Sequence, residues 1–129
     1  MIVSFRIIQS PIALAGLVSL LSGAVLADGP QAIATAVQHS GLAANAADIG
    51  AVHRHLHHVL NCLVGPDGDG FDAASGNPCA AAGGAIPQTA DAAMKMKLEM
   101  AATQVRGGSA NANIEAAKKV ATDVQAMLR

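Results

Sequence analysis

Four of the five histidines of the chain stand within one block of six residues, 53–58, with the sequence HRHLHH. A neutral imidazole nitrogen is a good ligand for Zn²⁺, Cu²⁺ and Ni²⁺, so this density of histidines favours a transition-metal site. If no metal binds, the same block forms a solvated polar face that gains positive charge as the pH falls below about 6.5. The block is the strongest indication of chemistry in the sequence.

Helical geometry restricts which of these histidines can act together. Successive side chains on a helix are rotated by about 100°, so His53 and His57 lie on one flank of the apolar stripe and can share one ion. His55 and His58 lie on the other flank, in line with Cys62. The flanks are too far apart for a single cage of four histidines, so we expect two weak sites, or one site and a spare pair. We predict that His53 and His57 form the better site.

Three further side chains are candidate ligands. His39, near the end of the first predicted helix, supplies a third donor if that helix packs beside the block. Met96 and Met100 form an i, i+4 pair of thioethers, which favours Cu(I), although methionine more commonly fills gaps in a core with few aromatic residues. If the methionines also bind metal, copper is the best candidate; if only the histidines do, zinc and nickel are equally good.

The two cysteines, Cys62 and Cys79, flank a glycine-rich segment that has little means of ordering itself. A disulfide between them would close this loop and contribute about 3 kcal/mol in the chain-entropy model. The alternative is a thiolate ligand at Cys62, which excludes the disulfide. The aspartates of the loop do not match the register of a calcium-binding loop, so turn formation and solubility explain them.

Apolar residues at steps of three and four predict four helices, and no segment alternates polar and apolar residues long enough to form a strand. Asn45 and Thr89 are predicted to cap the second and third helices, Gly41 to end the first, and Gly107 and Gly108 to end the third. Short turns within each pair of helices indicate two helical hairpins, joined by the long glycine-rich loop. We therefore expect an all-α fold, a small four-helix bundle. The predicted elements are helices 30–39, 46–64, 89–106 and 110–128 and the loop 65–88.

Residues 1–27 have the pattern of a secretory signal peptide. Arg6 gives a short positive region, residues 7–26 are mostly apolar, and small residues precede a cleavage position after Ala27. An uncleaved membrane anchor is the alternative, which the polar interruptions of the apolar stretch disfavour. We expect a single helical domain over 28–129, periplasmic or secreted, with no stable membrane insertion after cleavage.

Composition excludes several classes of function. The chain has 129 residues, 52% apolar and 2% aromatic, with a formal net charge of −1, so it lacks the positive field that binds nucleic acid. Many of the apolar residues are alanines, which bury little area, so a domain of this size needs a disulfide or metal to support its core. The scarcity of aromatic residues, which would cover a porphyrin, argues against haem as a cofactor. No nucleophile or zinc-protease motif is present, so we expect no enzyme activity.

The sequence therefore predicts an exported, non-catalytic helical protein that binds copper, zinc or nickel through its histidine-rich helix, as a carrier, buffer or sensor. The alternative is a structural or partner-binding module without metal. In that case the histidines would titrate at an interface with another periplasmic protein or with a second copy of the chain.

Overall fold

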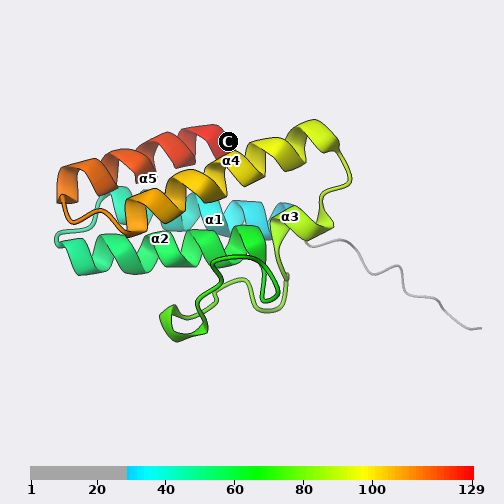
Figure 1. Cartoon of the computed structure of the whole chain (residues 1–129), viewed down its shortest axis with the longest axis horizontal. Coiled ribbons are helices and arrows are strands. Elements are labelled where there is room, and N and C mark those ends of the chain that lie inside the picture. Colours follow the sequence, from blue (N-terminus) through cyan, green and yellow to red (C-terminus); the bar gives the residue numbers. More distant parts are fainter. Residues whose placement is uncertain (1–28) are drawn as a thin grey trace, which may run out of the picture.

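The computed structural model describes residues 29–129, and the predicted signal peptide lies outside these described residues. All regular structure in the described part is helical, which confirms the predicted all-α class (Figure 1). No helix of this part is long and apolar enough to cross a lipid bilayer. The elements are α1 (Gly29–Ala44), α2 (Ile49–Val64), the 3-10 helix η1 (Ala73–Ser75), α3 (Ala85–Gln88), α4 (Ala92–Ser109) and α5 (Ile114–Leu128).

The four long helices pack as two hairpins, α1 with α2 and α4 with α5 (Figure 1). Helix α1 also packs on α5, and α2 on α4, so each long helix lies between two others. The short helices η1 and α3 belong to the segment that connects the hairpins, which the sequence analysis had predicted to be an irregular loop. This arrangement puts α1 directly beside the histidine-rich helix α2.

The core follows the predicted apolar stripe of α2. Val52, Leu56, Val59 and Leu63 are fully buried, as expected from their steps of three and four residues. The neighbouring helices face this stripe largely with alanines, whose small side chains let helices approach closely. The fully buried alanines are Ala32, Ala36 and Ala43 of α1, Ala101 of α4, and Ala117 and Ala121 of α5, together with Ala85 of α3.

Two glycines that the sequence analysis took as helix ends lie inside helices instead. Helix α1 continues past Gly41 to Ala44, and α4 continues through Gly108 to Ser109. At Gly108 a Cβ atom would lie 2.7 Å from Val120 Cγ1, and at Gly41 it would lie 2.5 Å from Gln125 Nε2. Gly108 is therefore needed where α5 packs closely on α4, whereas at Gly41 only the flexible end of the Gln125 side chain would have to move.

The caps of α2 and α4 also differ from the predicted ones. Asp48 caps α2, accepting a hydrogen bond from Ala51 N at 2.8 Å, and Asp91 caps α4, accepting one from Met94 N at 2.7 Å. Asn45, the predicted cap of α2, donates to the carbonyl oxygen of Gly41 instead. Because an aspartate oxygen satisfies the free N–H groups of the first turn, each cap moves the start of its helix to the residue after the aspartate.

Cys62, in the last turn of α2, forms a disulfide with Cys79, and both residues are buried. The longer segment between α2 and α3 is also held where two glycines meet, one directly after α2 and one directly before α3. A Cβ on Gly65 would lie 2.9 Å from Gly84 N, and one on Gly84 would lie 2.5 Å from Gly65 N. Gly65 also has φ +74°, a conformation that favours glycine. The segment between α2 and α4 is thus held to the end of α2.

Candidate metal site

Three histidines from two helices come together on the α1 and α2 side of the bundle. They are His39 of α1 and His55 and His58 of α2, and one ring nitrogen of each lies within 4.8 Å of the others. His39 Nδ1 is 3.2 Å from His55 Nδ1 and 3.2 Å from His58 Nδ1. Because α1 runs on beyond its predicted end, His39 stands on a helical turn and faces α2. We refer to these three residues as the histidine cluster.

The spacing of the nitrogens suits a tetrahedral metal ion. Bonds of about 2.0–2.1 Å from zinc to imidazole place two ligand nitrogens of a tetrahedral site about 3.3–3.4 Å apart. The two distances from His39 Nδ1, both 3.2 Å, are close to this separation. The three side chains are partly buried, so the cluster is near the surface and accessible to an ion. A ligand nitrogen of His55 and one of His58 lie within 4.8 Å of each other, so the three imidazoles would supply three of the four ligands of a tetrahedral ion.

The contact between His58 and the loop fixes which nitrogen of that ring can bind a metal. His58 Nε2 lies 2.7 Å from the carbonyl oxygen of Ser75, the last residue of η1. A carbonyl oxygen only accepts hydrogen bonds, so Nε2 carries the hydrogen and donates it. In the neutral ring, the lone pair is then on Nδ1, which faces His39. Metal-binding histidines usually donate a hydrogen bond from the ring nitrogen that does not bind the metal, as His58 Nε2 does here.

The nitrogens of the cluster cannot all satisfy one another when the rings are neutral. His39 Nδ1 has two Nδ1 neighbours at 3.2 Å, but it carries at most one hydrogen. It can therefore donate one well-aligned hydrogen bond, and at least one of the two contacts is left poorly satisfied. A cation between the three nitrogens accepts all three lone pairs at once.

The protonation of the cluster favours metal binding near neutral pH. The pKa of His39 is lowered from 6.5 to about 4, mainly by burial and to a smaller extent by the nearby rings of His58 and His55. Burial also lowers the pKa of His55, with smaller contributions from His58 and Arg54. His39 and His55 are therefore neutral at pH 7, which is the form that binds a metal ion.

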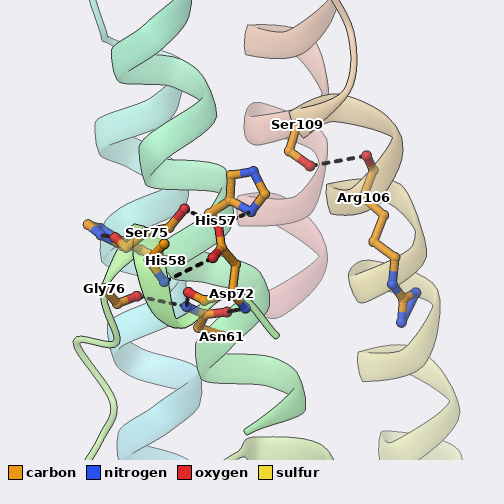
Figure 2. A network of polar contacts seen from close by, with 9 residues as sticks. His57, His58, Asn61, Asp72, Ser75, Gly76, Arg106 and Ser109 are labelled. Carbon is orange, nitrogen blue, oxygen red and sulfur yellow. Dashed lines mark hydrogen bonds and ion pairs between the residues drawn. The ribbon is translucent and has the colours of Figure 1, made fainter. Parts of the chain in front are cut away.

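The other two histidines of α2 are directed elsewhere. His53 Nε2 lies 2.8 Å from the carbonyl oxygen of Asn111, in the turn between α4 and α5. His57 faces the loop (Figure 2), with its Nδ1 4.0 Å from Asp72 Oδ2 and without a hydrogen-bond partner. We predicted that His53 and His57 form the better site. The structure instead brings the third histidine, His39, to the other pair, His55 and His58. The flank of His53 and His57 faces a carbonyl and a carboxylate, whereas the opposite flank faces His39 on α1.

The methionines of α4 lie apart from the histidine cluster. Met96 and Met100 are 60% and 52% exposed, and Met94 is 39% exposed. The interpretation that these side chains fill the core is wrong, because the buried face of α4 begins only at Leu98. Copper binding by Met96 and Met100 remains a prediction.

Asn61 binds the loop beside the histidine cluster, and its role was not predicted from the sequence. It is fully buried, and its Nδ2 donates to the carbonyl oxygens of Asp72 at 2.8 Å and Gly76 at 2.7 Å, while its Oδ1 accepts from Asp72 N at 2.9 Å (Figure 2). All hydrogen-bonding atoms of the amide are thus used. An asparagine within the apolar run at the end of α2 was a usable signal, because a buried amide must find partners.

Asp72, at the start of η1, organises the same part of the loop. Its Oδ1 accepts from Ala74 N and its Oδ2 from the Ser75 hydroxyl. These two hydrogen bonds lower the pKa of the Asp72 carboxyl group, with the Ser75 hydroxyl as the larger cause.

Comparisons of the chain with models of protein families, with curated proteins and with solved structures find no significant match. The function is therefore argued from the geometry of the site.

Proposed function

We propose that this protein binds one transition-metal ion through the Nδ1 atoms of His39, His55 and His58. The observation that carries the proposal is the position of His39 Nδ1, 3.2 Å from both other Nδ1 atoms. Neutral imidazoles select zinc, copper(II) or nickel among the common ions, and the tetrahedral spacing favours zinc. The role that fits such a site in a small protein is carrier, buffer or sensor, without catalysis.

The proposal includes export to an oxidising compartment. Residues 1–27 have the pattern of a cleaved signal peptide, and the Cys62–Cys79 disulfide is typical of proteins outside the cytosol. A periplasmic or secreted location would also keep both thiols oxidised, so that neither competes with the histidines for the ion. In this account, metal binding rests on imidazole alone.

The experiment is a calorimetric titration of tag-free protein with Zn²⁺, Cu²⁺ and Ni²⁺ at pH 7.5. Two double variants form a matched pair, because each removes two histidines from α2. We expect His55→Ala plus His58→Ala to abolish binding, and His53→Ala plus His57→Ala to leave it within a few-fold of the wild-type protein. His39→Ala should weaken binding strongly although it lies outside the histidine-rich block.

The thermal stability of the same variants gives a second measurement. A metal that binds only the folded protein stabilises it by about 2.7 kcal/mol at a free concentration of 100 times Kd. We expect added metal to raise the melting temperature of the wild-type protein and of the double variant His53→Ala plus His57→Ala, and of no other variant. If no ion binds folded wild-type protein, the metal function is excluded. Association that changes between pH 5 and 7.5 with chelator present would then favour the partner-binding module.

A further inference from the structure

The disulfide-closed loop reaches the histidine cluster through three residues on one side of the last turns of α2. His58, Asn61 and Cys62 each contact the loop by a different kind of bond. His58 donates to the Ser75 carbonyl oxygen, Asn61 binds the loop backbone, and Cys62 forms the disulfide with Cys79. One of these three residues is also a proposed metal ligand, so the loop and the metal site share a side chain.

The carbonyl oxygen that meets His58 is held from both sides. Asn61 binds the backbone of Asp72, three residues before Ser75, and that of Gly76, the residue directly after it. Gly76 has φ +88°, and a Cβ there would lie 3.5 Å from His58 Nε2. The loop backbone therefore runs close against the imidazole, in a conformation that glycine adopts readily. This fixes the direction of the hydrogen bond to His58 Nε2.

Holding the Nε2–H of His58 keeps its Nδ1 lone pair directed at His39. If the loop moves away, Nε2 can bind water, and the ring is free to rotate or to change its tautomer. Both changes remove a ligand atom from the cluster. Loss of such an outer hydrogen bond typically lowers metal affinity by about 10-fold to 100-fold.

We propose that Asn61 and the Cys62–Cys79 disulfide set the metal affinity of the histidine cluster by holding the Ser75 carbonyl against His58, so that opening the loop weakens metal binding by the histidines. The inference rests on the proposed metal function. Asn61 is in this account a positioning residue, and the disulfide holds the other end of the same loop. The ligand set itself contains no sulfur.

The loop has to be opened without freeing a thiol, because a Cys62 thiolate lies in line with His55 and His58 and would itself bind the ion. The contact between Gly65 and Gly84 does not involve the disulfide, so we expect this end of the segment to stay at the end of α2 when the disulfide is absent.

The test measures Zn²⁺ affinity at pH 7.5 by competition with a chelator. The oxidised wild-type protein is compared with the double variant Cys62→Ser plus Cys79→Ser, which imitates the open loop without supplying thiolate ligands, and with Asn61→Ala. A destabilised control is Val124→Ala, a fully buried position of α5 outside the site. Circular dichroism confirms that each variant is folded at the temperature of the titration.

We expect the double serine variant and Asn61→Ala to bind Zn²⁺ 10-fold to 100-fold more weakly than the wild-type protein, with Val124→Ala unchanged. The NMR signal of the hydrogen-bonded His58 Nε2–H should be visible in the oxidised protein and lost in both loop variants. Equal Zn²⁺ affinity in all four proteins overturns control by the loop but leaves the metal function intact. A wild-type protein that does not bind Zn²⁺, Cu²⁺ or Ni²⁺ overturns the metal function itself.

Discussion

His39 Nδ1 lies 3.2 Å from His58 Nδ1, although the two residues are 19 positions apart and belong to different helices. This contact joins α1 to the histidine-rich helix α2 and brings His39 together with His55 and His58 in one cluster. It depends on the close packing of α1 on α2, to which small residues contribute. The properties of the cluster should therefore respond both to its own protonation and to the packing of the helices.

The first prediction concerns the pH dependence of stability without metal. In the unfolded chain His39 takes up a proton near pH 6.5, whereas in the folded protein its pKa is about 4. Between these values the unfolded state binds more protons, so stability is fully present above about pH 6.5 and is lost as the pH falls toward 4. The lowered pKa of His55 acts in the same direction.

Urea unfolding with chelator present, at pH 7.5 and at pH 5, measures this effect. We expect His39→Gln to lose less stability between these two pH values than the wild-type protein. Thr103→Ala, an exposed change on α4, serves as a control with the wild-type pH dependence. An unchanged difference in His39→Gln would show that this histidine is not held neutral by the fold.

The second prediction tests the contact between α4 and α5. Gly108→Ala should destabilise the protein by about 1–3 kcal/mol, because the new Cβ would meet Val120 at 2.7 Å and Leu56 Cδ1 at 3.2 Å. Gly107→Ala is the matched control. A Cβ there meets nothing within 4 Å, so the variant should be more stable by about 0.5–1 kcal/mol through helix propensity. Equal effects at both positions would contradict the packing described for Gly108.

The third prediction concerns the start of α2. Asp48→Ala should lower the free energy of unfolding by about 1 kcal/mol, because it removes the acceptor for Ala51 N. Asn45→Ala should have a smaller effect, since its side chain donates to the Gly41 carbonyl oxygen and caps no first turn. Chemical denaturation of the two variants decides between the caps. A larger loss in Asn45→Ala would restore the start of the helix that the sequence analysis favoured.

The fourth prediction concerns processing and the disulfide. Intact mass of the protein from an exporting host should correspond to a chain that begins at Asp28. Titration of the denatured, unreduced protein should find no free thiol, and Cys79→Ser should lower the melting temperature. Full-length chain in the membrane fraction would contradict cleavage after Ala27, and two titratable thiols would contradict the bond between Cys62 and Cys79.

The helices were predictable from the sequence where the apolar pattern is dense, as in α2, whose stripe of Val52, Leu56 and Val59 is buried as expected. The ends of the helices were harder to predict from the sequence. A glycine near the end of a helical pattern has the same appearance whether it ends the helix or, like Gly108, allows a neighbouring helix to approach. Only the packing of the other helix distinguishes the two roles.

The sequence predicted that histidines form the candidate site, but it did not predict which three of the five histidines come together. Helical periodicity separated His55 and His58 from His53 correctly, because it depends on one helix alone. It could not show which flank would meet another donor, because that depends on how α1 packs on α2. The third histidine, His39, was therefore a conditional candidate, and the role of the Ser75 backbone had no signal in the sequence.

The most direct test of the central claim is to identify the coordinating nitrogens by ¹⁵N NMR of the histidine rings, with and without one equivalent of Zn²⁺ at pH 7.5. The account predicts that the Nδ1 signals of His39, His55 and His58 shift to the values of metal-bound nitrogen, while those of His53 and His57 stay unchanged. Coordination through His53 and His57, or no change in any ring of the folded protein, would contradict it.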